Sequence, residues 1–427
     1  MELGEVLSLL EEKNVFLTGG AGVGKSFLTN EIISHYRSER KSVVALGSTG
    51  VSAVGIGGST IHSFFCFGIS EDFEALSSLD KKNKSRLKEL KKILEVTDLI
   101  VIDEISMVST TLFDMIVYRL ESMDYQGRIL LVGDFYQLPP IQKSNNESLF
   151  GDLLFAFESV AWRGLNLHVL ELTKMHRTND EYFAYILNKI RKGICDDEVV
   201  NLLSHFRNNS FSLKYEPTYL FGRNAEVEQT NRRKLAAIKG EEVCFTPEIV
   251  FGTKVHESRL ASWKKNLPIN EYLILKVGAP VLFTVNKWGK FANGERGVVR
   301  EIGENFVIVE KENEYIKVEP HPFDLTEIAI DKEGRLKSVT LATLSQLPIK
   351  LAYAVTIHKS QGMSIDGLIC DVNHIFATSQ FYVAISRAVD PKHLQIIYNN
   401  HNFENYLQKI IRVDSRVHQY YEAIKHL

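Results

Sequence analysis

The chain has 427 residues, of which 44% are apolar and 24% are charged, and its formal net charge at pH 7 is −3. A chain of this length is expected to form about two to four domains, and its composition is that of a globular enzyme. The slightly acidic balance excludes a protein that attracts nucleic acid through bulk charge, so any such binding requires a local groove.

No apolar run is long enough to cross a membrane, and the acidic beginning MELGEVLSLLEEKN is unlike a signal peptide. The four cysteines are far apart and form no C-x-x-C pair; they are Cys66, Cys195, Cys244 and Cys370. This pattern predicts neither a disulfide framework nor a zinc site, so we expect a cytoplasmic protein that does not contact membranes.

The first feature in chain order is a short apolar run, residues 15–18, followed by GGAGVGKS and a helix-like pattern. The spacing fits G-x-x-x-x-G-K-[ST], in which glycines let backbone N–H groups surround a phosphate at a helix N-terminus. Lys25 would neutralise the β- and γ-phosphates, and the Ser26 hydroxyl would ligate Mg²⁺. The alternative is a simple glycine-rich turn. The predicted nucleotide-binding residues here are Gly19, Gly20, Ala21, Gly22, Val23, Gly24, Lys25, Ser26 and Phe27.

Further continuous apolar runs predict buried strands at residues 42–47, 99–103 and 129–134. A second set of such runs occurs at residues 218–222, 279–285, 352–357, 368–371, 381–386 and 394–398. Buried strands that alternate with helices form parallel sheets covered on both faces, so an α/β protein with two such halves is predicted. Only the first half has a phosphate loop, which indicates one nucleotide in a cleft that both halves share.

Two segments interrupt this pattern. Residues 290–346 show short alternating strands with tight turns, which predicts a small antiparallel barrel inserted into the second half. A helical insertion is expected in the first half near residues 65–96. It contains the basic run KKNKSRLKELKK at residues 81–92, which is either a nucleic-acid contact or the solvated face of a helix.

Acidic and polar side chains follow two strands of the first half. In LIVIDEISMV, Asp103 and Glu104 stand at the carboxyl end of a strand, the edge where parallel sheets bind ligands. Asp103 is predicted to hold Mg²⁺, and Glu104 to orient and deprotonate a water molecule. In ILLVGDFYQLPP, Gln137 is predicted to hydrogen-bond the γ-phosphate and that water; the alternative is a polar loop residue.

Hydrolysis spreads negative charge over the γ-phosphoryl oxygens, and an arginine from across a cleft stabilises that charge. Arg177 lies at the junction of the halves and Arg387 ends FYVAISRA in the second half. If Arg387 reaches a phosphate bound by Lys25, the two halves must close on the triphosphate and relax after its hydrolysis, as a motor element does. Either arginine taken singly is also compatible with a surface ion pair.

The order of these segments resembles that of superfamily-one helicases that move 5′ to 3′, and most closely the petite-integration-frequency (PIF) helicases. The matching segments are GGAGVGKS, STGVSAVGIGGSTIHSFF, VIDEISMV, LLVGDFYQLPP, MHRTND, TIHKSQGMSID and FYVAISRA, from residue 19 to residue 388. The resemblance implies a first RecA-like domain at residues 1–175 and a second at residues 176–289 and 347–427. It also implies that residues 290–346 form an SH3-like β-barrel and that the insertion near residues 65–96 separates strands.

The resemblance also implies site residues. It assigns ATP hydrolysis to Lys25, Ser26, Asp103, Glu104, Gln137, Arg177, Gly362 and Arg387. It assigns single-stranded DNA contacts to Thr49, Gly50, His62, Ser63, Phe64, Thr356, His358 and Lys359, with Gln361 as the link to the nucleotide. Hydroxyl and backbone N–H groups bind phosphates without reading bases. Phe64, Phe65 and Trp288 are candidate stacking faces for bases, or else buried aromatics.

Two positions depart from the family pattern. The family usually has a glutamine before the phosphate loop that reads the adenine edge, but the first glutamine here is Gln126. The family also tends to have Arg-Gln where this chain has Arg177 and Thr178. Adenine preference and one contact near Arg177 are therefore not implied by the resemblance.

The resemblance implies an ATP- and Mg²⁺-dependent 5′-to-3′ DNA helicase in replication, repair or recombination. It would act as a monomer on single-stranded and tailed duplex DNA, and on G-quadruplexes or RNA–DNA hybrids, near the nucleoid. One alternative is a partner-dependent translocase subunit like the exonuclease V alpha chain, which the lack of a sizeable additional N-terminal domain disfavours. Another is a nucleotide-gated DNA-binding module, which the intact Lys25, Asp103, Glu104 and Arg387 disfavour.

Overall fold

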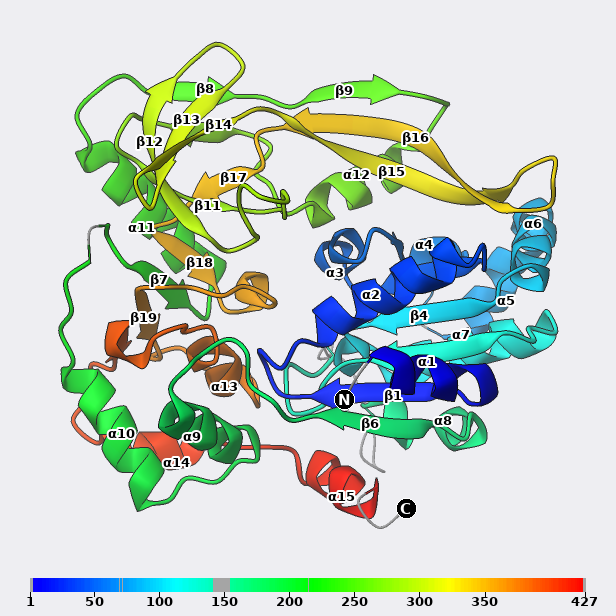
Figure 1. Ribbon diagram of the computed structural model, residues 1–427, viewed down its shortest axis with the longest axis horizontal. Helices are drawn as coiled ribbons and strands as arrows, with labels where there is room; N and C mark the ends of the chain where they lie inside the picture. Colours follow the sequence, from blue (N-terminus) through cyan, green and yellow to red (C-terminus); the bar gives the residue numbers. More distant parts are fainter. Residues whose placement is uncertain (1–2, 69, 71, 141–153, 214, 425–427) are drawn as a thin grey trace.

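The computed structural model describes residues 3–68, 70, 72–140, 154–213 and 215–424. Figure 1 shows two lobes built around separate sheets, with a group of antiparallel strands lying above both in that view. In the part of the chain that the structure describes, no helix combines the length and the apolar character needed to cross a membrane.

The first lobe is built on a parallel sheet of six strands. Their order is β3 (Ser59–Thr60), β2 (Val43–Gly47), β4 (Leu99–Asp103), β5 (Arg128–Val132), β1 (Val15–Gly19) and β6 (His168–Leu172). All residues of β1 and β4 are buried, as expected for strands covered on both faces. The four strands predicted here are therefore confirmed, whereas β3 and β6 were not predicted.

Helices cover both faces of this sheet. Val15 and Leu17 face a cluster that includes side chains of α1 (Leu3–Glu12) and α2 (Lys25–Ser38). Phe16 points to the opposite side, where α7 (Thr110–Ser122), α8 (Val160–Gly164) and α15 (Ser415–Ile424) pack. The remaining short helices of this lobe are α3 (Gly50–Gly55), α4 (Ile61–Phe64), η1 (Ile105–Met107) and η2 (Ala156–Glu158).

The predicted helical insertion is present as α5 (Phe73–Lys82) and α6 (Lys84–Glu95). One face of α6 is buried through Leu90, Ile93 and Leu94. The lysines of the basic run are exposed on these two helices. Exposure agrees with a solvated face and with a nucleic-acid contact alike, so the nucleic-acid contact stays a prediction.

The second lobe has a four-stranded parallel sheet in the order β18 (Ala354–Thr356), β7 (Thr218–Phe221), β19 (Leu368–Asp371), β20 (Leu394–Ile397). Its helices are α9 (Glu181–Arg191), α10 (Asp197–Asn208), α11 (Asn224–Ala237), α13 (Gln380–Ile385) and α14 (Phe403–Ile410), with η3 (His358–Ser360) and η4 (Pro391–His393) as short 3₁₀ turns. One strand prediction is wrong. The predicted strand at residues 381–386 falls on α13, which is buried on all sides, so its apolar run had no periodicity to distinguish it from a strand.

The run at residues 279–285 does form a strand, but its assignment to the second parallel sheet is wrong, because this strand belongs to the antiparallel group. A five-stranded sheet has the order β14 (Glu314–Val318), β13 (Val307–Lys311), β12 (Arg296–Ile302), β11 (Pro280–Phe283), β17 (Ile349–Leu351). A second sheet has the order β15 (His321–Ile330), β16 (Leu336–Gln346), β9 (Glu248–Phe251), with β16 in the centre. The antiparallel structure thus extends beyond the predicted limits of 290 and 346, because β11, β17 and β9 pair with its strands.

Two smaller elements complete this group, a pair of strands, β8 (Val243–Phe245) and β10 (Leu273–Leu275), and the helix α12 (Glu257–Asn266). The long β15–β16 hairpin reaches across to the first lobe (Figure 1), where Ile328, Ile330 and Leu336 pack against its core.

The C-terminal helix α15 leaves the second lobe and packs on the first. The Tyr421 ring stacks on Tyr136 with centroids 4.6 Å apart, and its hydroxyl lies 2.7 Å from Thr18 Oγ1. The same hydroxyl accepts a hydrogen bond from the Phe135 backbone N–H at 3.1 Å. Tyr421 therefore joins the strand before the phosphate loop to the segment that carries Gln137.

We expect Tyr421→Phe to lower the free energy of unfolding by about 1–3 kcal/mol, because it leaves the buried Phe135 N–H without an acceptor. Urea unfolding of both proteins measures the difference. Tyr315→Phe, on an exposed part of β14, is the control and should change stability by less than about 0.5 kcal/mol. Equal stability of Tyr421→Phe and the parent protein would contradict this role.

Candidate active site between the two lobes

The phosphate loop connects β1 to α2 with the backbone that the motif requires. Gly22 and Gly24 have φ angles of 81° and 91°, and Gly24 is the N-cap of α2. A Cβ atom on Gly22 would lie 2.6 Å from Arg177 Cβ, so only glycine fits between the loop and the second lobe. The loop therefore ends at the N-terminus of a 14-residue helix, where backbone N–H groups attract anions.

Lys25 is turned back onto this loop. Its Nζ donates hydrogen bonds to the carbonyl oxygens of Gly19 at 2.6 Å and Gly20 at 2.9 Å. Burial lowers the pKa of Lys25, and the negative charges of Asp134 and Glu104 oppose that shift. An ammonium group held in a glycine loop at a helix N-terminus fits the phosphates of a nucleoside triphosphate.

Asp103 and Glu104 lie at the end of β4, as predicted. Glu104 has a φ of 54°, and this left-handed residue ends the strand. The Glu104 N–H donates to Asp103 Oδ1 at 2.9 Å. Burial raises the pKa of both carboxyl groups, that of Asp103 to about 7 with a further contribution from the charge of Glu104. Two carboxylates withdrawn from water favour a cation beside them.

Mg²⁺ suits the oxygen donors available here. The Ser26 side chain is exposed at the start of α2, and Asp103 lies on the adjoining sheet edge. Across the described ranges there is no group of three or more His, Cys, Asp or Glu side chains placed to hold a metal. Mg²⁺ at nucleotide sites is generally held by one or two protein oxygens together with phosphates and water.

Gln137 is buried, and its Nε2 donates to Asp134 Oδ2 at 3.3 Å. Asp134 is fully buried and paired with Arg191 of α9, whose Nε and Nη2 donate to its two oxygens at 3.0 and 2.9 Å. Sequence analysis missed both residues. Asp134 stands at the end of a predicted strand and was detectable by the argument used for Asp103, whereas nothing in the sequence distinguishes Arg191.

The two candidate arginines are close to each other in the second lobe. Arg177 donates from Nε to Ser364 Oγ at 2.9 Å and from Nη1 to the Ser386 carbonyl at 2.7 Å. Arg387 is buried and donates to the Val383 carbonyl and Ser386 Oγ, both at 2.9 Å. Burial lowers the pKa of Arg177 to about 9 and that of Arg387 to about 10, so both carry charge at neutral pH.

Besides the bonds from Arg191 to Asp134, further hydrogen bonds between described residues cross the cleft. Gln361 Nε2 donates to Glu104 Oε2 at 3.2 Å. The Ala21 N–H of the phosphate loop donates to the Tyr382 hydroxyl at 2.8 Å. Tyr382 was not predicted, since its only sequence signal is its place in FYVAISRA. The neighbouring Gly362 has a φ of 79°, and its contact with nucleotide stays a prediction.

The predicted DNA-contacting residues come from both lobes. Thr49 caps α3, with its side chain accepting from the Ser52 N–H. Thr356 ends β18 and its Oγ1 accepts from the Lys359 N–H at 3.2 Å. Burial lowers the pKa of His62 and of His358, so both rings are uncharged near neutral pH. We call the set Thr49, Gly50, His62, Ser63, Thr356, His358 and Lys359 the DNA track; its DNA contacts stay a prediction.

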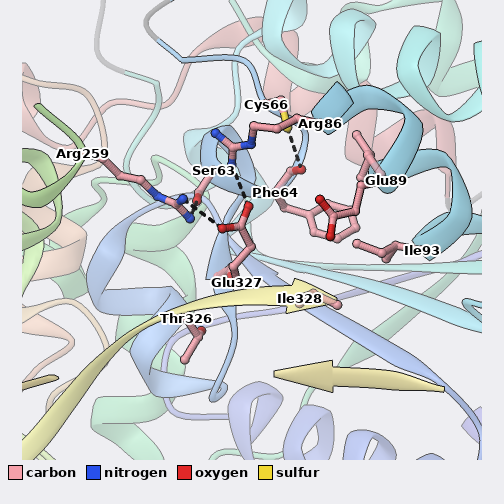
Figure 2. A pocket seen from close by; sticks show the side chains of 12 residues that line it. Ser63, Phe64, Cys66, Arg86, Glu89, Ile93, Arg259, Thr326, Glu327 and Ile328 are labelled. Atoms are coloured by element: carbon pink, nitrogen blue, oxygen red, sulfur yellow. Dashed lines mark hydrogen bonds and ion pairs between the residues drawn. The ribbon is translucent and has the colours of Figure 1, made fainter. Parts of the chain in front are cut away.

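Three residues of the DNA track, Gly50, His62 and Ser63, line a cavity of about 330 Å³, which α12 also lines. Figure 2 shows the adjoining pocket, where Glu327 of β15 lies between Arg86 and Arg259. Glu327 accepts from Arg86 at 3.0 Å and from Arg259 at 3.2 Å, and Arg259 also donates to Ser63 Oγ at 3.4 Å. The β15–β16 hairpin is thereby linked through Arg259 to Ser63 of the DNA track.

The stacking hypothesis for Phe64 and Phe65 is corrected by the structure. Both are buried, and their rings pack edge to face with centroids 4.9 Å apart. Because each ring fills the core beneath the DNA track, neither offers a free face to a base. Trp288, by contrast, is fully exposed at residues 286–290, all of which are exposed.

Comparison with known proteins gives consistent matches. Residues 4–201 match the family model described as PIF1-like helicase, and residues 308–413 match one described as Helicase. The chain is 42% identical over 432 residues to the ATP-dependent DNA helicase Pif1 of Campylobacter jejuni, covering 97% of this chain and 95% of that protein.

Among solved structures, the Bacteroides sp. Pif1 complex with ADP-AlF4 is similar with a TM-score of 0.84 and 28% identity. The superposition covers 99% of this chain and 96% of the Bacteroides chain. The Bacteroides Pif1 complex with ADP-AlF3 and single-stranded DNA is similar with a TM-score of 0.65, at 27% identity and the same coverage.

Glu104→Gln is expected to lower kcat for triphosphate hydrolysis by about 10²- to 10⁴-fold, because the amide cannot accept a proton from water. Triphosphate binding should persist, since the amide oxygen still accepts from Gln361. Steady-state hydrolysis and equilibrium binding of a fluorescent triphosphate separate the two effects. The exposed Glu121→Gln on α7 serves as the matched control, and equal loss of binding and turnover would argue against this role for Glu104.

Proposed function

The chain belongs to the PIF1-like helicase family and is an ATP-dependent DNA helicase, and we propose that its cleft couples ATP hydrolysis to movement along single-stranded DNA. In this proposal both lobes hold one Mg²⁺–ATP and one DNA strand at the same time. When the cleft opens or closes, the distance between the DNA-contacting residues of the two lobes then changes.

The hydrogen bond between Gln361 and Glu104 is the observation that carries this proposal. Gln361 lies two residues after Lys359 and three after His358, so one short segment joins the DNA track to the predicted catalytic carboxylate. Movement of DNA against His358 would be transmitted to the group that orients water. Conversely, a change in the nucleotide site at Glu104 would alter DNA binding through the same hydrogen bond, because linkage between two binding sites is reciprocal.

The chain's own residues have defined tasks in this scheme. Lys25 and the loop N–H groups bind phosphates, and Ser26 and Asp103 are the oxygen ligands for Mg²⁺. Bound Mg²⁺–ATP supplies the phosphoanhydride bond whose cleavage drives the cycle. Glu104 accepts a proton from a water that it shares with Gln137. Arg177 and Arg387 come from the second lobe and neutralise the negative charge of the γ-phosphoryl oxygens. Their attraction to that charge holds the cleft closed only while the charge is present.

The proposal extends to the substrate. The DNA track offers hydroxyl groups, backbone N–H groups and one exposed lysine. These groups bind phosphates rather than bases, which favours sequence-independent binding of a single DNA strand. We further propose 5′-to-3′ movement as a monomer and unwinding of tailed duplexes, with G-quadruplexes or RNA–DNA hybrids as additional substrates. Replication, repair or recombination in a bacterial-type cytoplasm, at the nucleoid, is the proposed setting.

Gln361→Ala tests the coupling directly. We expect the stimulation of ATP hydrolysis by single-stranded DNA to fall by about 5- to 150-fold, the range of a coupling free energy of about 1–3 kcal/mol. ATPase rates with and without oligonucleotide give this ratio, and DNA affinity is measured in parallel. Gln126→Ala, at an exposed glutamine, should leave the ratio unchanged; full stimulation of Gln361→Ala would remove the coupling role.

Duplexes with a 5′ or a 3′ single-stranded tail test the direction of movement. The expected outcome is ATP-dependent strand separation of the 5′-tailed substrate and none of the 3′-tailed one. Activity confined to the 3′-tailed substrate would refute the polarity. Hydrolysis stimulated by DNA without strand separation of either substrate would favour the partner-dependent subunit instead.

A further inference from the structure

A pocket between α5 and α7 of the first lobe has no role in the scheme above. It has a volume of about 340 Å³, and the first residue of α6 completes its lining. Figure 1 shows these helices at the edge of the first lobe that is remote from the second parallel sheet. A ligand in this pocket would therefore leave the cleft between the lobes open.

The apolar walls of this pocket are formed by Phe73, Leu76 and Tyr118. The rings of Phe73 and Tyr118 meet edge to face, with centroids 5.6 Å apart. Leu76 is buried, but Phe73 is 44% exposed and Tyr118 is 49% exposed. A single exposed ring is ordinary on a protein surface. Two rings around one hollow still have apolar area to bury, and such aromatic surface is typical of protein–protein interfaces.

The rim of the pocket is positively charged. Lys81 and Lys84 line it, and within the described ranges neither ammonium group has an ion-pair partner. The carboxylate that lines the pocket, Asp80, is neutralised by Arg119, whose Nη1 and Nη2 donate to its two oxygens at 2.8 and 2.9 Å. The other lysines of the basic run at residues 81–92 are exposed on the same two helices. The pocket therefore combines apolar walls with a rim that attracts negative charge.

We propose that this pocket is the docking site for an acidic peptide segment of a partner protein, with one apolar side chain of that segment inserted between Phe73 and Tyr118. The rim lysines would attract carboxylates on either side of the inserted residue, and the walls would bury it. DNA would be attracted by the same lysines. Its phosphates carry no apolar group, however, and the paired bases of a duplex are already stacked, so the peptide fits this combination of groups better.

A labelled peptide of aspartates with one central phenylalanine is the probe, and fluorescence anisotropy measures its affinity for the full chain. Replacing the phenylalanine by serine should weaken binding by about 10-fold or more, as expected for losing a residue that anchors an interface. Tyr118→Ala should cause a similar loss with the phenylalanine peptide and little additional loss with the serine peptide. Tyr315→Ala, at a β14 ring that is 69% exposed, is the matched control and should bind as the parent protein does.

The rim is tested by Lys81→Glu and Lys84→Glu. Each should weaken binding of the phenylalanine peptide by about 2- to 5-fold, the range for an exposed ion pair. Lys92→Glu changes an exposed lysine of the same run that does not line the pocket, and it should have a smaller effect. Equal losses from all three variants would assign the attraction to bulk charge and overturn the proposal.

Single-stranded and duplex oligonucleotides distinguish a peptide site from a nucleic-acid site. The affinity of Tyr118→Ala for either oligonucleotide should equal that of the parent protein, and so should its rate of ATP hydrolysis, which also shows that the variant is folded. A loss of oligonucleotide affinity in Tyr118→Ala would assign the pocket to DNA instead. That result, or the absence of measurable binding of the phenylalanine peptide to the parent protein, would overturn the proposal.

Discussion

The buried ion pair between Asp134 and Arg191 determines how the two lobes meet. Asp134 follows strand β5 of the first lobe, and Arg191 comes from a helix of the second. Both are almost completely removed from water, where an unpaired charge costs several kcal/mol. Every arrangement of the lobes that separates the pair is therefore unfavourable in free energy. Gln137 also donates a hydrogen bond to the Asp134 carboxylate.

The other contacts across the cleft depend on that arrangement. With Arg191 seated on Asp134, Tyr382 reaches the phosphate loop and Gln361 reaches Glu104. The C-terminal helix adds a second connection, because Tyr421 of α15 contacts Thr18 and Phe135 in the first lobe. The residues predicted to bind phosphate, ligate the metal and activate water are thus held from both sides.

Several features of the fold were predictable from residues close in sequence. The strands at residues 15–18, 42–47, 99–103 and 129–134 were predicted because continuous apolar runs of that length form buried strands in parallel sheets. The same reasoning failed at residues 381–386, where a short helix is apolar on every side. It also failed at residues 279–285, because an apolar run does not reveal which sheet it will join.

The sequence alone predicted the chemistry of this protein. The spacing of GGAGVGKS and the carboxylates after residue 102 predicted a nucleotide cleft, since a phosphate loop and the end of a strand depend on local backbone geometry. The order of the later segments gave the resemblance to the helicase family. Only the tertiary structure decided which side chains meet: that Arg191 pairs with Asp134, that Phe64 and Phe65 are buried, and that Phe73 lies exposed beside Tyr118. Such contacts join residues that are far apart in the chain, and the packing that creates them leaves no periodic signal in the sequence.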